Sequence, residues 1–411
     1  MRGISAVCSR RGVHCPAVAG ETGGLSASTR WALAVGCAVS VSNLYYLQPL
    51  LAQVAADFRV SEGQAGLAAT LSQVGYGLGI LTIVPLGDIR ERRALALTTL
   101  GATTLLALAM ATAPSFPLLC VASLLLGVAT CTPQLLVPFA ATLARSEERG
   151  RTVGFVMSGL LLGILLARTA SGFVSAQWGW RAVYLIAAVL MVGLAVMVRA
   201  LLPESRSANE PVSYGRLLRS LGSLVRDEPV LRESAIYGAC LFGAFSAFWT
   251  TLSFHLAGPP FDMGPKGAGS AAGLFGLVGA AGALAAPLAG RMADQGGPRR
   301  TIAIGILVTL ASFGIMLAPS IAMLVVGVLL MDVGVQATQI SNQSRVYSLR
   351  PEARNRLNTV YMTVYFVGGS LGSALGAWAW GLWGWPGVCG VGAGFALLAL
   401  TEFFATRAKA G

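Results

Sequence analysis

The sequence predicts an all-α membrane protein with 12 transmembrane helices in two pseudo-symmetric six-helix bundles. First, the 411 residues are 55% hydrophobic and only 11% charged, less than half the charged share of an ordinary soluble domain. Second, apolar runs of about 20 residues recur, each long enough to cross a hydrocarbon core of roughly 30 Å as a helix. Third, an acidic-plus-basic segment occurs twice, and its aspartates, Asp88 and Asp294, lie 206 residues apart (294 − 88). A fixed offset near half the chain length indicates an internal repeat.

Each span is predicted from an apolar run and its polar boundaries. The connections at 114–116 and 319–320 are so short that the helices flanking each one must pack as antiparallel neighbours. The predicted spans lie at about 31–54, 65–86, 94–113, 117–143, 152–175, 182–201, 234–256, 269–289, 301–318, 321–343, 357–380 and 387–405.

The polar segments divide the chain into five parts. The longest polar link between spans contains three prolines and a weakly amphipathic stretch, so we place the boundary between the halves there. The parts are a disordered cytoplasmic tail at 1–29, an N-terminal six-helix bundle at 30–202, a cytoplasmic linker at 203–232, a C-terminal six-helix bundle at 233–406 and a C-terminal tail at 407–411.

Basic residues gather on one side of the predicted spans. Of the 29 Lys and Arg residues, 25 fall on the side of the termini, 3 fall on the other side and Arg168 lies within a span. Cytoplasmic loops carry an excess of Lys and Arg, so we expect a multi-pass protein of the inner cell membrane with both termini in the cytoplasm. The same topology accounts for the net charge of +12, and no basic patch with interleaved aromatics indicates nucleic-acid binding.

Patterns typical of metals, cofactors and nucleotides are missing from the sequence. The 7 cysteines show no metal-ligand spacing, and most lie in apolar spans, where Cys packs as a small hydrophobe. The glycine-rich stretches lie inside apolar helices and contain no GxxxxGKS/T phosphate loop. We expect no metal, no cofactor and no nucleotide. We also expect no enzymatic activity, because no nucleophile–base pair lies at one membrane depth.

The repeated loop carries a resemblance to a known family. Two six-helix halves, each with this loop between its second and third helices, resemble the major facilitator superfamily of secondary transporters. The second copy matches the family pattern at Gly290, Asp294, Gly297, Arg299 and Arg300. The first copy keeps Asp88, Arg92 and Arg93. It departs at Ile89 and Glu91, which replace a basic residue and a glycine.

The first span narrows the resemblance. Its segment Asn43–Leu50 resembles the first helix of bacterial arabinose-efflux-like or drug-antiporter-like permeases. Drug–proton antiporters of the superfamily usually carry an Arg in helix 4, but the corresponding position here is Ser123. The resemblance therefore does not imply the usual antiporter route of proton coupling.

The resemblance implies that the two loops act as gate latches. Asp88 would pair with Arg92 or Arg93, or face the positive start of the eleventh helix near Arg356. Asp294 would correspondingly face the start of the fifth helix. Such contacts exist only while the cytoplasmic side is closed, so they bias one of two states. The alternative is that the loops simply carry positive-inside charges with incidental acids.

Two charges lie well inside the predicted spans, Arg168 in the fifth and Asp332 in the tenth. A charge in hydrocarbon is costly, so it normally faces the interior of the bundle and marks a pathway. Their depths differ by roughly 6 Å at about 1.5 Å per residue, which an Arg side chain can cover. Two interpretations stay open: Asp332 as a proton or substrate-cation site, or the two residues as a structural ion pair.

A polar face on the tenth span indicates a cavity. Asp332, Gln336, Gln339 and Asn342 follow at steps of 4, 3 and 3 residues, so they share one helix face. In a lipid-embedded helix that face must point inward. Interhelical hydrogen bonding is the alternative for each residue. The candidate cavity residues are Asn43, Tyr46, Gln134, Trp249, Gln336, Gln339 and Asn342.

Together these features favour a secondary active transporter that works by alternating access. Small-molecule efflux is the favoured direction, with proton coupling as an option. Uptake or facilitated diffusion of a sugar or metabolite is the first alternative, and a non-transporting membrane receptor or enzyme is the second. We expect a monomer whose partners are a small-molecule substrate and the lipid bilayer.

Overall fold

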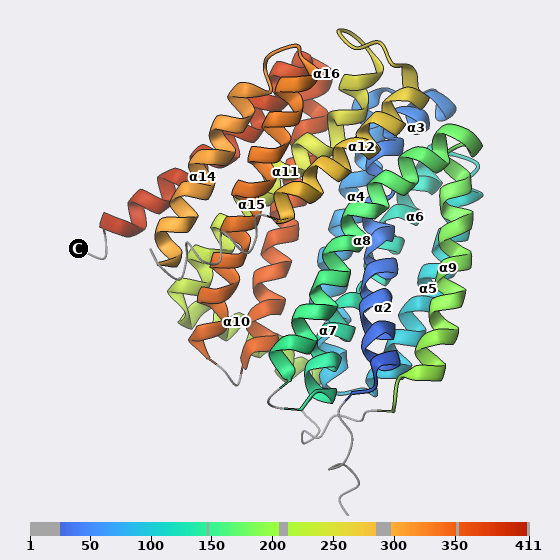
Figure 1. The fold of residues 1–411 in the computed structure, drawn as a ribbon. Helices are drawn as coiled ribbons and strands as arrows, with labels where there is room; N and C mark the ends of the chain where they lie inside the picture. Colours follow the sequence, from blue (N-terminus) through green and yellow to red (C-terminus); the bar gives the residue numbers. More distant parts are fainter. Residues whose placement is uncertain (1–24, 146–147, 205–212, 285–296, 351–352, 409–411) are drawn as a thin grey trace, which may run out of the picture.

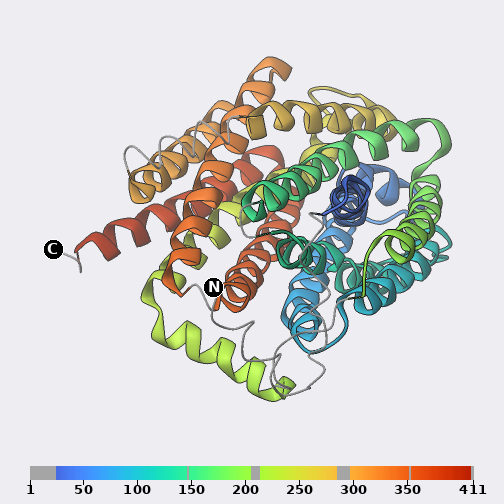
Figure 2. The same cartoon turned by 60° about the horizontal axis from the view of Figure 1, so that its bottom comes forward.

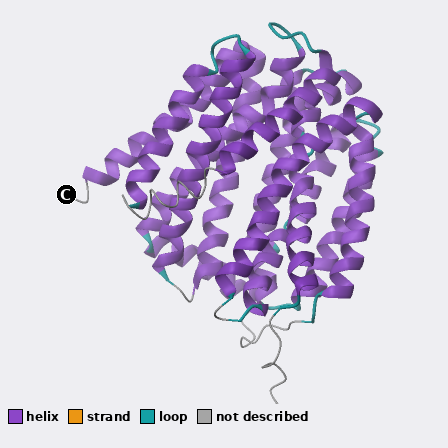
Figure 3. Ribbon diagram, in the orientation of Figure 1, coloured by secondary structure: helices purple, strands orange, loops and turns teal. Residues whose placement is uncertain are grey.

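The computed structural model describes residues 25–145, 148–204, 213–284, 297–350 and 353–408. Across these ranges the chain forms helices, turns and loops and no strands (Figure 3). Nine stretches of the described chain are long and apolar enough to cross a membrane, and the last, Arg354–Thr406, is long enough for two crossings. The predicted twelve-helix arrangement in two bundles is confirmed.

The N half contains the first six spans and lies on one side of the molecule (Figure 1). Its elements are α2 (Ala27–Tyr45), η1 (Gln48–Leu50), α3 (Leu51–Phe58), α4 (Glu62–Thr82), η2 (Val84–Asp88), α5 (Arg92–Ala111), α6 (Phe116–Ala129), α7 (Thr132–Leu143), α8 (Arg149–Trp178) and α9 (Trp180–Leu201).

Two of the spans in the N half are broken. The first breaks between α2 and η1, where Pro49 lies at the start of the new helical turn. The fourth breaks at Thr130 and Cys131, just before Pro133 in the first turn of α7. Proline has no N–H to donate and its ring clashes with the preceding turn, so a helix tends to end before it.

The C half contains the last six spans. Its elements are α11 (Pro229–Ala257), α12 (Gly264–Leu284), α14 (Pro298–Ile315), α15 (Ile321–Leu349) and α16 (Arg354–Ala408). The amphipathic α10 (Tyr214–Asp227) joins the halves and lies across one end of the bundle (Figure 2). The predicted eleventh and twelfth spans both belong to α16, which is interrupted at Gly384, where φ is 61°.

Specific residues start the helices where the sequence places them. Ser61 and Gln64 form a reciprocal capping box, which begins α4 at Glu62. Gly179 has φ of 80° and ends α8, so that α9 can begin at Trp180. Gly384 adopts a positive φ at the corresponding place in the C half, 205 residues later (384 − 179). Positive φ is costly for residues with a Cβ, so glycine suits both turns.

We call the two ends of the bundle the Asp88 end and the Glu62 end, and the boundary between the halves the seam. At the Glu62 end the halves are in direct contact. The indole of Trp380 donates to Glu62 Oε2 at 2.7 Å, and the Thr70 hydroxyl donates to Ser373 Oγ at 2.9 Å. Gly172 of α8 packs so closely on the α12 backbone that a side chain there would collide with it. The seam is therefore closed at the Glu62 end.

Candidate functional site

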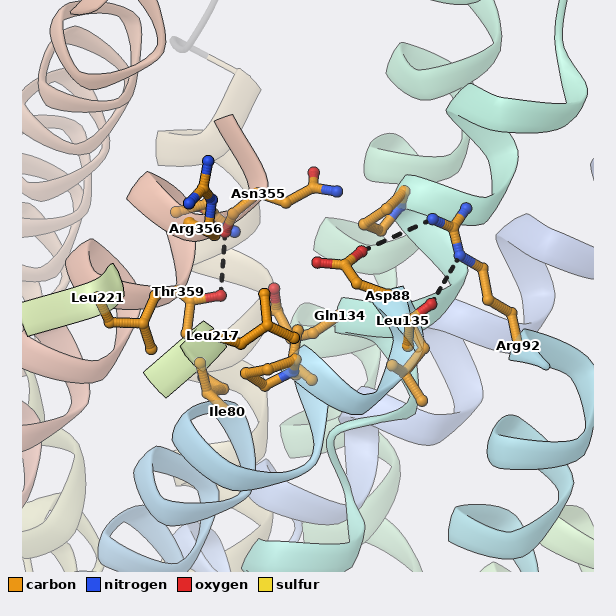
Figure 4. A pocket seen from close by; sticks show the side chains of 15 residues that line it. Ile80, Asp88, Arg92, Gln134, Leu135, Leu217, Leu221, Asn355, Arg356 and Thr359 are labelled. Carbon is orange, nitrogen blue, oxygen red and sulfur yellow. Dashed lines mark hydrogen bonds and ion pairs between the residues drawn. The ribbon is translucent and has the colours of Figure 1, made fainter. Parts of the chain in front are cut away.

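A pocket lies between the halves at the Asp88 end (Figure 4). It measures about 620 Å³ including its open mouth. Asp88 and Arg92 of the N half line one side, and Asn355 and Arg356 at the start of α16 line the opposite side. Leucines of α10 also line it. The first copy of the loop motif and the beginning of α16 therefore face the same pocket.

Within the pocket, Asp88 at the end of η2 pairs with Arg92, the first residue of α5. An Nη2–Oδ1 distance of 3.8 Å separates Arg92 from Asp88, and Arg92 also donates to Thr142 Oγ1 at 2.6 Å. At the start of α16, Asn355 lies within hydrogen-bonding reach of the Asp88 carboxylate and Arg356 affects it electrostatically, while among the described residues the ion pair of Asp88 is with Arg92. Asp88 thus pairs with Arg92 of the N half and also faces the start of α16 across the pocket.

Glu91 explains one departure of the first loop from the family pattern. Its carboxylate accepts hydrogen bonds from the backbone N–H groups of Arg93 and Ala94, at 2.8 and 2.5 Å. A carboxylate at the N-cap accepts from N–H groups that a helix start leaves unpaired. Its negative charge also stabilises the positive end of the helix dipole. Arg93 itself donates to Glu204 at 2.8 Å, so it fixes the end of α9 and takes no part in the Asp88 pair.

The second loop is only partly described. Gly290 and Asp294 lie outside the described residues. Gly297 has φ of 81° and precedes α14, which places Arg299 3.6 Å from Glu233 and 2.9 Å from Thr406 Oγ1. Arg300 is exposed. Arg299 therefore ties α14 to the ends of α11 and α16.

Glu233 is the centre of a network that the sequence prediction missed. Its carboxylate accepts from Arg345 Nη2 at 2.6 Å and from the Tyr237 hydroxyl at 2.8 Å. These bonds join α11 and α15 at the Asp88 end. The available signal was an acidic residue four positions before a tyrosine, directly at the start of an apolar span, since residues four apart share a helix face.

Arg168 lies deep inside the molecule and belongs to the seam. Its side chain is 1% exposed, and its Nε donates to Gln48 Oε1 at 2.8 Å. The guanidinium lies 4.1 Å from the ring centroid of Trp249 in α11 and 4.8 Å from that of Tyr45. Cation–π contact of this kind is stronger in a desolvated setting. The sequence prediction missed Gln48, although a polar residue before Pro49 in an apolar span was a usable signal.

Asp332 is also buried, at 5% exposure, but it does not contact Arg168. A Cβ added at Gly279 of α12 would collide with Asp332 Oδ2 and lie 3.7 Å from Trp249 Cζ2. Trp249 presents one face to Arg168, and its Cζ2 edge and Asp332 both lie near Gly279, while Arg168 and Asp332 are near enough to interact electrostatically. In the described part of the chain no ion pair joins them, and the direct pair that their depths allowed is not formed.

The remaining cavity candidates are dispersed. Asn43 is 1% exposed and donates to Met191 Sδ at 3.4 Å, within the N half. Gln134 lines the Asp88-end pocket and donates to the Tyr76 hydroxyl at 3.3 Å. Tyr46 is 8% exposed.

The polar face of α15 runs from Asp332 toward the Asp88 end. Gln336 is half-buried, and Gln339 Oε1 accepts from the Tyr361 hydroxyl at 2.6 Å. Asn342 is fully buried, and neither of its side-chain polar atoms has a partner among the described residues. Buried polar groups normally have partners, so this face retains unused hydrogen-bonding capacity.

Comparisons with known proteins identify the class. A sequence model of the Major Facilitator Superfamily matches residues 33–286 and 258–410, so the chain belongs to that superfamily. Together with the twelve-helix fold, this makes the protein a secondary transporter.

Individual relatives agree with this assignment. The uncharacterized transporter YgaY of Escherichia coli O157:H7 is 42% identical over 375 residues, which is 90% of this chain and 93% of that protein. Multidrug resistance protein D of Escherichia coli K12 is 29% identical over 180 residues, 43% of this chain and 44% of that protein. The fold matches a bacterial homologue of the human lysosomal transporter Spinster, solved in an inward-facing and unoccupied conformation. Its TM-score is 0.69 at 14% identity, over 92% of this chain and 93% of that one.

Proposed function

We propose that the protein exports small amphipathic molecules across the inner bacterial membrane by alternating access. The similarity to Multidrug resistance protein D, which extends over 43% of this chain, supports the outward direction. The mixture of aromatic and uncharged polar side chains at the seam, with one buried acid, suits amphipaths better than polyanions.

The distribution of basic residues supports an orientation. We propose that the Asp88 end faces the cytoplasm, because 25 of the 29 Lys and Arg residues fall on that side. In that orientation the contacts at the Glu62 end close the structure toward the outside, while the pocket at the Asp88 end faces the compartment from which a substrate would be exported.

The observation that carries the proposed coupling is the position of Asp332. It is a carboxyl group buried at the seam, beside the close approach of α12 and next to Trp249. A buried carboxylate without a cation in contact is costly in a membrane, so binding of a proton or a cationic group at Asp332 is favourable. We propose that this occupancy differs between the two states of the seam and so couples transport to protons.

Purified protein in liposomes tests this proposal. A proton gradient is imposed, and uptake of cationic and neutral amphipaths is followed with the unchanged protein and with Asp332→Asn. We expect gradient-dependent transport that Asp332→Asn reduces to background. Asp262→Asn is the matched control, because Asp262 is exposed in a loop and has φ of 49°, which Asn tolerates. Transport that ignores the gradient and survives Asp332→Asn contradicts proton coupling.

Facilitated diffusion of a sugar or metabolite is the second candidate. One observation favours it: Ser123 of α6 is fully buried and bonds to Met110 Sδ at 3.4 Å, where drug–proton antiporters carry an arginine. The same liposomes distinguish the two, because a facilitator equilibrates a radiolabelled sugar without any gradient and accumulates none.

A further inference from the structure

Two opposite charges at the seam are each left without a charged partner in contact. Arg168 Nη2 has no hydrogen-bond partner among the described residues, although the side chain is 1% exposed. Asp332 is 5% exposed and lies against Gly279 of α12, and no salt bridge joins it to a basic residue in the described chain, although Arg168 is near enough to interact with it electrostatically. Buried charges in proteins are normally paired and hydrogen-bonded. Here a guanidinium and a carboxylate lie in one region of the seam without pairing with each other.

Trp249 adds an unused donor between them. Its indole Nε1 is buried and has no partner in the described chain. The Cζ2 atom, on the same edge of the indole as Nε1, is the one that approaches Gly279 beside Asp332. The region therefore offers two unused donors, Arg168 Nη2 and Trp249 Nε1, and one unused acceptor group, the Asp332 carboxylate.

The side chain of Arg168 is held in place by its neighbours. Gln48 holds Arg168 Nε at 2.8 Å, and the rings of Tyr45 and Phe245 lie 4.8 and 5.4 Å from the guanidinium carbon. Gly276 of α12 lies against the stem of Arg168, where an added Cβ would be 3.1 Å from Arg168 Cβ. These contacts fix the Arg168 side chain, and no salt bridge joins it to Asp332 in the described chain, so a ligand with an anionic and a cationic group can supply the missing partners.

We propose that the seam binds zwitterionic amphipaths, small molecules that carry a carboxylate and a protonated amine on an apolar body. The carboxylate accepts from Arg168 Nη2, and the amine donates to Asp332. The apolar body packs on the faces of Trp249 and Phe245. The half-buried Gln336 and Gln339 continue the polar face of α15 from Asp332 toward the Asp88 end, which gives such a molecule a polar route to the site. This inference rests on the proposed function and names its substrate class.

The chemistry of the two charges makes the prediction selective. A buried site built to bind a charged group rejects an analogue that lacks this group, because its own charge then stays unpaired. Removing the carboxylate of the ligand should lower its affinity only when Arg168 is present, and removing the amine should lower it only when Asp332 is present.

Binding to the purified full chain in detergent, measured by calorimetry, tests this. The probes are phenylalanine and alanyl-phenylalanine, each as the free zwitterion, as the C-terminal amide and as the N-acetyl derivative. We expect at least one zwitterion to bind about tenfold or more tightly than both of its derivatives. Arg168→Gln should equalise the free acid and the amide, and Asp332→Asn should equalise the free amine and the N-acetyl form.

Two further variants keep the test decisive. If Arg168→Gln does not fold, Gly276→Ala takes its place, because the added methyl lies 3.1 Å from Arg168 Cβ and should weaken only the preference for the free acid. Arg181→Gln is the matched control. Arg181 also stacks on a tryptophan, 4.4 Å from the Trp180 ring, but it pairs with Asp57 away from the seam. This control should leave both preferences unchanged.

The inference is overturned if no probe binds, if the three forms of each probe bind equally, or if the preferences survive the seam variants. Its failure is distinguishable from that of the proposed function, because binding is measured without a gradient. Proton-driven transport of amphipaths without a charge preference removes this inference alone. A charge preference in binding without transport in liposomes removes the proposed function alone.

Discussion

Charged side chains inside this protein are compensated in two different ways. Glu233 and Arg345 are in direct contact at 2.6 Å, with side chains 12% and 14% exposed. Arg168 instead lies against aromatic faces and one amide oxygen. The first arrangement uses a partner within the chain and stabilises the C half. The second leaves hydrogen-bonding capacity unused, which is the property expected of a residue that has an external partner.

Removal of the Glu233 charge should destabilise the protein. In Glu233→Gln the largely buried Arg345 loses its carboxylate, and the cost should lie between about 0–1 kcal/mol for an exposed pair and about 3–5 kcal/mol for a fully buried one. Thermal unfolding of the protein in detergent should show a clearly lowered Tm. Glu228→Gln is the matched control, since its partner Arg350 is 42% exposed and exposed pairs contribute about 0–1 kcal/mol. Equal effects of the two variants would contradict the role of Glu233.

At the scale of elements, glycines determine how closely the helices of the C half pack. Gly368 and Gly372 of α16 lie against the backbone of α11 at Ala239 and Gly243. Close approach through small residues is the usual basis of helix association in membranes. The same arrangement between α8 and α12 closes the seam at Gly172.

A methyl group at this contact should therefore be costly. Gly372→Ala places a Cβ into the carbonyl oxygen of Gly243, and overpacking of this kind costs about 1–3 kcal/mol. Gly381→Ala, in the same helix with nothing near the added Cβ, should be neutral or stabilising by up to about 1 kcal/mol. Thermal unfolding of the two variants side by side measures the difference. A similar change in Tm for both variants would show that the packing of Gly372 against Gly243 does not limit stability.

The sequence predicted the elements well where hydropathy determines them. The acid-base repeat and the apolar runs predicted the twelve spans. The break at Thr130 was missed, because Pro133 was read as part of one continuous apolar run. The division between the two helices of α16 was placed correctly around Gly384, since Gly384 repeats the turn at Gly179.

The site was less predictable, because its contacts join residues far apart in the chain. Arg168 and Asp332 could be identified from the sequence, because charged residues inside an apolar span are energetically costly. Their relation could not be predicted, since it depends on how α8, α11, α12 and α15 pack together at the seam. Spacing placed Asn43 on a cavity face, yet tertiary packing turns it toward Met191. Gly290 and Asp294 lie outside the described residues, so their predicted latch remains a prediction.

At the scale of the whole molecule, we expect the contacts at the Glu62 end to favour the state in which this end of the seam is closed. Trp380→Phe removes the indole donor to Glu62, and a hydrogen bond to a charged group contributes about 1.5–3 kcal/mol. The population closed at this end should then fall about tenfold or more relative to the open one. Spin labels at the exposed Arg59 and Lys266, in a background without the native cysteines, would report longer distances.

Tyr214→Phe serves as the control for that measurement. It removes a side chain–backbone bond of 2.8 Å to Thr82 at the opposite end, so it should not lengthen the distance between Arg59 and Lys266. Unchanged distances in Trp380→Phe would show that packing alone, without the Glu62 bond, holds this end closed.

The breaks in the first and fourth spans have a mechanical consequence. Their counterparts in the C half, α11 and α15, are each uninterrupted over 29 residues. We therefore expect flexure at these breaks, which lie next to α2 and α7 and which α11 and α15 lack. A probe attached to α15 should report movement of the helix as a unit, whereas one attached to α2 or α7 should also record flexure at the break.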